Sequence, residues 1–241
     1  VLAAMKHVGV NVAADPLFTA GYNGVSGGFV VVSADDPGMH SSQDEQDNRY
    51  YAKFMKLALL EPVDSQEAKD FVAAALEISE QFDTPVMLRT TTRISHSKSL
   101  VELGERKEIP VKPYKKDPAK YFVVPANQRP KRPLIENRLA RLAEYADTFS
   151  GNRVEGNGQD FAVITSGPGY LYAREALGDR ATYLKLSMTW PLPERLIRDF
   201  IGKHDKVYLI EEGEPFLEEQ IKALGLPVIG KEIFPRIGEL S

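Results

Sequence analysis

Short unbroken apolar runs alternate with stretches of helical periodicity over the first hundred residues. The β-branched run 29–32 has no polar interruption, which is typical of a strand covered on both faces in a parallel sheet. Asp64 or Ser65 can cap a helix whose apolar positions, from Ala68 to Ile78, keep helical spacing. We therefore predict a parallel α/β sheet with strands at 1–5, 29–32, 57–60 and 85–88 and another helix at about 12–22.

A second unit is predicted from about residue 134, where an amphipathic helix to about 149 is expected. Helices are expected after Pro168 and Pro193 and over 215–224, the last closed by Gly225 as a C-cap. The interspersed apolar runs predict strands at 160–165, 181–186, 207–210 and 226–229. This alternation predicts a small doubly wound domain over 134–241, following a first domain over 1–100.

Residues 101–133 between these units are rich in proline, lysine and arginine. Such a composition is typical of an extended, solvated linker. Its cations could bind nucleic acid or an acidic partner, but few aromatic residues interleave them, which favours a charged connector.

Composition narrows the possible chemistry. The chain has no cysteine, so disulfides, iron–sulfur ligation and thiolate chemistry within it are excluded. A formal net charge of −4 gives no overall attraction to nucleic acid, and no apolar run approaches the ~20 residues that span a bilayer. The chain opens without an initiator Met, in what we interpret as the end of a buried strand, and we expect it to be a fragment.

Two loops at predicted strand ends carry most of the candidate chemistry, because ligands of parallel α/β sheets bind beyond the carboxyl ends of the strands. The first loop, 6–11, places Lys6 and His7 at a helix entrance, which favours an anion. A structural histidine beside an exposed lysine is the alternative. The second loop, 34–47, offers His40 as a possible acid–base group, with two hydroxyls and several carboxylates. Its spacing matches neither a calcium loop nor a zinc site, so we predict no metal in this chain, and a hydrated surface loop stays open.

Two other strand ends are chemically weaker. The turn 165–170 could cradle a phosphate and make the chain a nucleotide-binding protein, but Pro168 removes one backbone donor, which favours a tight strand-to-helix turn. Glu211, Glu212 and Glu214 follow the predicted strand 207–210 and are interpreted as a solvated edge. Acid–base work by a carboxylate pair there is the alternative.

Several unusual motifs together resemble one family. They are MKHVGVNVAADP (5–16), ADDPGMHSSQ (34–43), EQDNRYYAK (45–53), LRTTTR (88–93), SGPGY (166–170) and EEGEPFLEEQ (211–220). In this order they are similar to the large subunit of indolepyruvate:ferredoxin oxidoreductases, and the resemblance covers nearly the whole chain. It implies that 1–100 is the later part of a thiamine pyrimidine-binding domain and 134–241 a transketolase C-terminal-like domain.

The resemblance also implies the reaction, which is oxidative decarboxylation of an aryl-2-oxoacid to an acyl-CoA. Thiamine diphosphate with magnesium would carry the chemistry in the complete enzyme, CoA would be a co-substrate, and 4Fe-4S clusters would lie elsewhere. The implied partners are a smaller subunit and ferredoxin, in a cytoplasmic protein that binds neither nucleic acid nor membrane.

The same resemblance places the two loops at the cofactor and the 2-oxoacid. It implies proton-transfer or donor roles for His7 and His40, without choosing between them, and cofactor contacts for Lys6, Gly9, Asn11, Asp36, Gly38, Ser41 and Ser42. The Gly-Asp-Gly motif that the family uses for metal and diphosphate is absent, because Gly178-Asp179-Arg180 does not match it. We therefore expect the isolated chain to be inactive. A non-catalytic interaction module is the other alternative.

Overall fold

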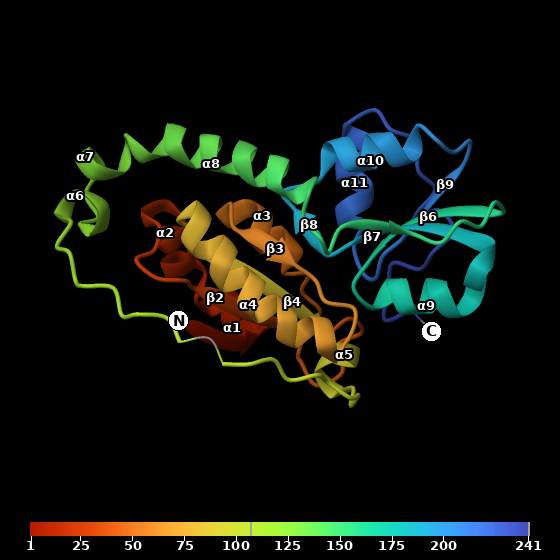
Figure 1. The fold of residues 1–241 in the computed structure, drawn as a ribbon, viewed down its shortest axis with the longest axis horizontal. Helices are drawn as coiled ribbons and strands as arrows, with labels where there is room; N and C mark the ends of the chain where they lie inside the picture. Colours follow the sequence, from red (N-terminus) through yellow and green to blue (C-terminus); the bar gives the residue numbers. More distant parts are fainter. Residues whose placement is uncertain (107, 241) are drawn as a thin grey trace.

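The computed structural model describes residues 1–106 and 108–240, which form two sheets lying side by side (Figure 1). The first sheet has the order β1-β2-β4-β3-β8. Its members are β1 (Leu2–Lys6), β2 (Val30–Asp35), β3 (Ala58–Leu60), β4 (Val86–Thr91) and β8 (Met188–Trp190). Neighbouring strands are parallel, except that β8 runs antiparallel to β3 and pairs Trp190 with Leu59.

Helices connect the parallel strands as the apolar periodicity indicated. Asp64 caps the longest of them, because its side chain accepts a hydrogen bond from the backbone N–H of Glu67. The apolar stripe of this helix, which includes Phe71, Ala75 and Ile78, is buried against the sheet. The helices of this region are α1 (His7–Val12), α2 (Ala14–Asn23), α3 (Arg49–Met55), α4 (Ser65–Phe82) and α5 (Thr92–His96).

The basic segment after α5 is pinned to the first sheet unit at its far end. The Lys120 amino group donates to the backbone carbonyl of Val25 at 2.8 Å and pairs with Asp83 at 2.7 Å. Two short helices, α6 (Pro118–Tyr121) and α7 (Pro125–Gln128), precede α8 (Lys131–Ala146), which begins three residues earlier than the sequence suggested. Residue 107 lies outside the described part of this segment.

The second sheet has the order β5-β7-β6-β9. Its strands are β5 (Arg153–Glu155), β6 (Phe161–Ser166), β7 (Ala181–Leu186) and β9 (Val207–Ile210), and its helices are α9 (Pro168–Leu177), the short 3-10 helix η1 (Gly178–Arg180), α10 (Glu194–Ile201) and α11 (Phe216–Ala223). Strands β6, β7 and β9 are parallel, whereas β5 is antiparallel to β7.

One continuous apolar core joins the two sheets. It combines Val31, Leu59 and Met87 of the first sheet with residues of the second unit, such as Leu184 and Phe216. A separate core lies on the opposite face of the first sheet, where α8 contributes Leu142 and Ala146. Thus α8, which the sequence assigned to the second unit, packs on the first sheet.

The predicted α/β class with parallel sheets is confirmed, three local predictions were wrong, and two strands were not predicted. Residues 6–11 are not a loop, since α1 begins at His7 directly after β1. The opening strand is a half-exposed edge strand rather than a buried one. Strands β5 and β8 were not foreseen, because each has only three residues and, unlike β3, does not lie in an unbroken apolar run. The segment 226–229 contributes only a single bridge, between Ile229 and Tyr208. Among the described residues, none of the helices has the length and apolarity needed to cross a membrane.

Candidate functional site

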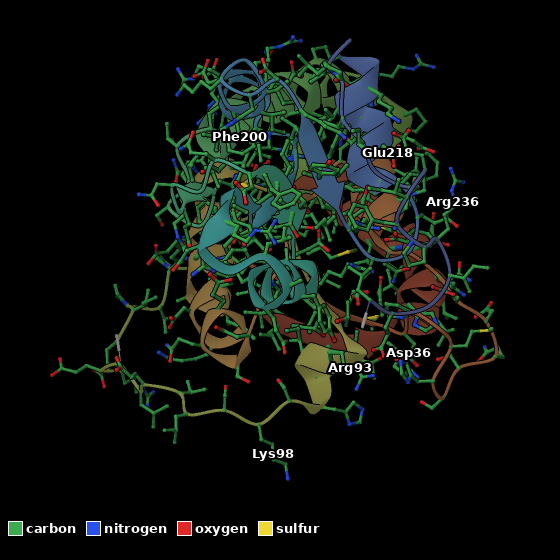
Figure 2. All side chains as sticks on the ribbon, turned by 90° about the vertical axis from the view of Figure 1, so that its right-hand side faces the viewer. Asp36, Arg93, Lys98, Phe200, Glu218 and Arg236 are labelled. Atoms are coloured by element: carbon green, nitrogen blue, oxygen red, sulfur yellow. The ribbon has the colours of Figure 1, made fainter. Side chains whose placement is uncertain are left out.

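The two predicted loops meet at the carboxyl edge of the first sheet. Lys6 ends β1, and its amino group donates to Asp36 Oδ2 at 2.7 Å and to Ser41 Oγ at 3.0 Å. Ser42 Oγ donates to Asp36 Oδ2, and Thr92 Oγ1 donates to Asp36 Oδ1, each at 3.0 Å. These five residues, Lys6, Asp36, Ser41, Ser42 and Thr92, form what we call the strand-end cluster, and Asp36 is its centre. Figure 2 shows where Asp36 lies on the fold.

The carboxyl of Asp36 is held in its ionised form. Burial alone would raise its pKa, but hydrogen bonds from Lys6, Thr92 and Ser42 outweigh that effect and lower the pKa well below its ordinary value. An ionised Asp36 fixes the Lys6 ammonium and the Ser42 hydroxyl in place. The hydroxyls of Ser42 and Thr92 are used on Asp36, so the donors that the cluster leaves for an anion are the oriented Lys6 ammonium and the Ser41 hydroxyl.

His7 occupies the first position of α1 and is fully buried. Its Nε2 lies 3.3 Å from the backbone carbonyl of Asp44 in the second loop, and its Nδ1 has no hydrogen-bond partner. The Asn48 side-chain amide donates to the backbone carbonyl of His7 at 3.3 Å and to Ser33 Oγ at 2.9 Å. A buried ring nitrogen without a partner is uncommon, so His7 keeps unused hydrogen-bonding capacity inside the protein.

His40 lies in a different environment. The loop turns sharply before it, with positive φ angles at Gly38 (80°) and Met39 (66°). Its side chain is 36% exposed, and its Nε2 lies 3.1 Å from Glu239 Oε1 in the C-terminal segment. The same glutamate pairs with Arg93 at 2.6 Å. The structure thus gives His40 a carboxylate partner that the sequence reasoning did not foresee.

Two other predicted residues lie along α1 rather than in a loop. Gly9 allows α1 to approach β1, because a Cβ at this position would lie 2.9 Å from the Cβ of Met5. Asn11 is exposed, and its Oδ1 accepts a short hydrogen bond from the Tyr51 hydroxyl. Their observed neighbours are Met5 and Tyr51, and their cofactor roles stay predictions.

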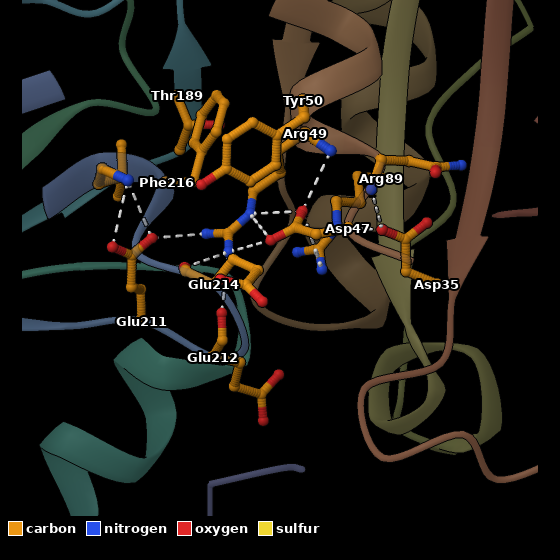
Figure 3. Close-up of polar contacts among 12 residues, drawn as sticks. Asp35, Asp47, Arg49, Tyr50, Arg89, Thr189, Glu211, Glu212, Glu214 and Phe216 are labelled. Atoms are coloured by element: carbon orange, nitrogen blue, oxygen red, sulfur yellow. Dashed lines mark hydrogen bonds and ion pairs between the residues drawn. The ribbon is translucent and has the colours of Figure 1, made fainter. Parts of the chain in front are cut away.

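A buried ionic network beside this cluster was missed by the sequence reasoning (Figure 3). Arg49, which is 1% exposed, donates from Nε to Asp47 at 2.8 Å and from Nη1 to Glu211 Oε2 at 2.7 Å. Its Nη2 donates to the backbone carbonyls of Glu212 and Glu214. Arg49 therefore connects α3 of the first unit to the end of β9 in the second.

A second arginine, Arg89 on β4, extends this ionic network within the first sheet. Arg89 donates to Asp35 Oδ2 at 2.6 Å and to Glu61 Oε1 at 2.7 Å, and Glu61 also accepts from Thr189 Oγ1 at 2.7 Å. Burial raises the pKa of Asp35, against the opposing charge of Arg89. Burial acts on Asp47 too, but Arg49 and Arg89 together lower its pKa.

The prediction of a solvated edge after β9 was wrong for two of its three residues. Glu211 and Glu212 are buried, and only Glu214 is exposed. Glu211 also accepts hydrogen bonds from the backbone N–H groups of Leu217 and Glu218 at the start of α11. Its role is therefore to anchor α11 and to hold Arg49. The pair Glu211-Glu212 directly after a strand was the only sequence signal for a buried carboxylate. That Arg49 is the partner of Glu211 follows only from the folded chain.

The turn after β6 is a tight strand-to-helix connection, as favoured from the sequence. Residues 165–170 are all buried, and α9 starts at Pro168. A Cβ at Gly169 would lie 3.2 Å from the carbonyl oxygen of Ile210, so this glycine is needed for close packing. The geometry gives no support to a nucleotide site at this turn.

Comparison with known proteins agrees with the motifs. A family model described as pyruvate flavodoxin/ferredoxin oxidoreductase, thiamine diphosphate-binding, matches residues 30–148. The indolepyruvate oxidoreductase subunit IorA of Archaeoglobus fulgidus is 45% identical over 236 residues, covering 95% of this chain and 38% of that protein. IorA of Pyrococcus horikoshii is 41% identical, covering 100% of this chain and 40% of that protein. The chain belongs to the family of indolepyruvate oxidoreductase large subunits. It spans about two fifths of the length of these relatives.

Solved structures show the fold of the family. A 2-oxoglutarate:ferredoxin oxidoreductase from Magnetococcus marinus superposes with a TM-score of 0.66 at 15% identity, covering 95% of this chain and 49% of that one. A split-gene transketolase superposes with a TM-score of 0.56 at 12% identity, covering 95% and 65%. The predicted combination of a partial thiamine pyrimidine-binding domain with a transketolase-like unit is confirmed at the level of fold class.

The strand-end residues fit part of a thiamine diphosphate site. The Lys6 ammonium and the Ser41 hydroxyl suit a carboxylate or the polar edge of a heteroaromatic ring. The Nδ1 of His7 is unpartnered but buried. Within residues 1–106 and 108–240, no group of three or more histidine, cysteine, aspartate or glutamate side chains could hold a metal ion. The donors of the strand-end cluster fit the organic and substrate side of such a site.

Proposed function

We propose that this chain supplies the substrate-side wall of a thiamine diphosphate site in an aryl-2-oxoacid:ferredoxin oxidoreductase. One observation carries the proposal, namely that Lys6, at the end of β1 and directly before His7, bonds to Ser41 of the second loop at the carboxyl edge of the first sheet. The thiamine diphosphate-binding family model matches residues 30–148, which include Ser41 but neither Lys6 nor His7. The names of the relatives point to indolepyruvate as the substrate.

Each residue at this edge has a chemical role in the proposal. Asp36 keeps the Lys6 ammonium and the Ser42 hydroxyl oriented, so that Lys6 and Ser41 can bind the substrate carboxylate. His7 donates or accepts a proton at Nδ1, and Glu239 orients His40 at the mouth of the site. Thiamine diphosphate, when bound, supplies the carbanion chemistry of decarboxylation.

The rest of the reaction requires other parts of the enzyme. In the proposal, magnesium and the diphosphate are held by a different domain, and electrons leave through 4Fe-4S clusters to ferredoxin. The acyl group passes to CoA, a smaller subunit completes the assembly, and the protein is cytoplasmic. The isolated chain is then inactive.

The test is reconstitution of the full-length protein that carries this sequence, together with its smaller subunit. With thiamine diphosphate, magnesium and CoA present, indolepyruvate should reduce viologen. Replacing Lys6 by Met should raise the KM for indolepyruvate by about 10- to 100-fold, the range expected for loss of a charged hydrogen bond.

Lys203→Met is the matched control, because Lys203 is an exposed lysine of the second unit. It should leave the KM unchanged. An assembled enzyme without indolepyruvate-dependent reduction, and without a cofactor-dependent rise in Tm, would instead support a non-catalytic module. An unchanged KM in a correctly folded Lys6→Met enzyme would remove Lys6 from the site.

A further inference from the structure

An exposed aromatic surface lies on the helices of the first unit, away from the strand-end cluster. It surrounds an open groove of about 860 Å³ between α2, α3 and the start of α8. We call it the aromatic–basic face, and it consists of Phe18, Tyr22, Tyr50, Tyr51, Lys53, Phe54, Lys56 and Arg132. Phe54 is 72% exposed, and its ring packs edge-on against Phe18 with 4.6 Å between centroids. Tyr50 is exposed as well, whereas Phe18, Tyr22 and Tyr51 are half-buried in the wall of the groove. An open groove lined by aromatic residues is typical of an interaction surface.

The charge of this face is opposite to that of the chain as a whole. Three of its residues are cations, none of the described residues lining the groove is acidic, and the chain has a formal net charge of −4. Lys56 and Arg132 share one carboxylate, Glu136, at 3.1 and 2.7 Å. Lys53 lies over the ring of Trp190, at 5.3 Å from its centroid. A second carboxylate, Glu219 of α11, accepts a hydrogen bond from the Tyr50 hydroxyl at 3.3 Å. With three cations against Glu136 and Glu219, the face keeps a surplus of one positive charge around an aromatic centre.

The charge and the aromatic residues of this face favour some binding partners over others. Two copies of the face meeting across a two-fold axis would bring like charges together, which disfavours self-association. An acidic surface with an apolar or aromatic side chain is complementary in both charge and polarity.

We propose that the aromatic–basic face docks an acidic polypeptide surface from outside residues 1–241, with an apolar side chain packed beside Phe54. This contact does not depend on the proposed reaction. It would nevertheless reach the candidate site, because the Tyr51 hydroxyl is bonded to Asn11 in the last turn of α1, and α1 begins at His7. Docking would thus fix the helix that carries His7.

Zero-length carbodiimide cross-linking of the assembled full-length protein tests the proposal, because it joins a lysine directly to a contacting carboxylate. Lys53 or Lys56 should cross-link to an Asp or Glu outside residues 1–241. Hydroxyl-radical labelling should modify Phe54 about tenfold less than in the same protein carrying Lys53→Glu and Lys56→Glu, in which the contact is weakened and Phe54 uncovered. Lys203→Glu is the matched control and should leave Phe54 protected.

The outcomes separate the alternatives without any measurement of turnover. A cross-link between Lys56 and Glu136 is expected within the chain, because the two groups lie 3.1 Å apart, and it does not count toward either outcome. Cross-links from Lys53 or Lys56 to other carboxylates of residues 1–241 in a second copy, with none to residues outside 1–241, would overturn the proposal in favour of self-association. Phe54 labelled as fast in the wild-type assembly as in the charge-reversed protein would also overturn it. If the charge-reversed protein fails to fold, the position of the wild-type cross-links still decides the question.

Discussion

At the scale of single residues, Asp36 organises the candidate site. It accepts hydrogen bonds from Lys6, Ser42 and Thr92, which belong to three separate segments of the chain. Each of these donors follows or ends a neighbouring parallel strand, so the register of the sheet brings them to one carboxylate. The sequence could identify Asp36 as a loop carboxylate, but not as the acceptor shared by all three.

Replacing Asp36 by Asn should lower the free energy of unfolding at pH 7 by about 1–3 kcal/mol, because a charge-assisted acceptor is lost. The pKa of Asp36 is lowered in the folded protein, so its contribution is present above the unfolded pKa and is lost as the pH falls. Urea unfolding should therefore show the difference between wild type and variant narrowing below about pH 4.

Asp160→Asn is the control for this experiment. Asp160 is a 57% exposed carboxylate that pairs with Arg180, and its replacement should change stability little at either pH. If Asp36→Asn and Asp160→Asn lowered the free energy of unfolding by the same amount, Asp36 would not be the centre of the cluster.

At the scale of elements, two connections hold the sheets in a fixed relation. Strand β8 leaves the second unit and pairs with β3 of the first sheet, and the Arg49 network links α3 to the end of β9. The network also reaches the site, because Asp35 accepts from the backbone N–H of Asn48, whose side chain donates to the carbonyl of His7.

Replacing Arg49 by Met should lower the free energy of unfolding by about 3–5 kcal/mol, because Asp47 and Glu211 lose their shared cation in a buried environment. Arg195→Met is the comparison, since Arg195 is 67% exposed and lies 3.7 Å from Asp147. It should change stability by no more than about 0.5 kcal/mol. Both values come from urea unfolding, and similar losses in the two variants would contradict a structural role for Arg49.

At the scale of the whole molecule, the two sheets behave as one packed body in the structure. A single apolar core runs from Val31 and Met87 to Leu184 and Phe216, and α8 spans the first sheet before the chain enters the second (Figure 1). The division at 100 and 133 that the sequence suggested stays a prediction about domains, but the packing favours joint unfolding.

Joint unfolding can be measured with the single tryptophan, Trp190, which lies on β8 where the sheets meet. Its fluorescence and the far-UV circular dichroism should follow the same transition in urea. A fluorescence change at clearly lower urea than the loss of secondary structure would show that the junction opens before the sheets unfold.

The sequence by itself determined the fold class, most helices and parallel strands, and the family. These features depend on local periodicity, capping residues such as Asp64, and motifs read in order along the chain. It also selected the two loops that meet at the sheet edge, because parallel strands present their carboxyl ends together.

Only the tertiary structure decided how those parts are joined. Three-residue strands such as β8 are stabilised by the partner they find rather than by their own pattern. The burial of Glu211 and the choice of Arg49 as its partner depend on a contact between residues 162 positions apart. No local pattern contains such a pairing, because the free energy of a buried charge is set by the groups that surround it in the folded chain.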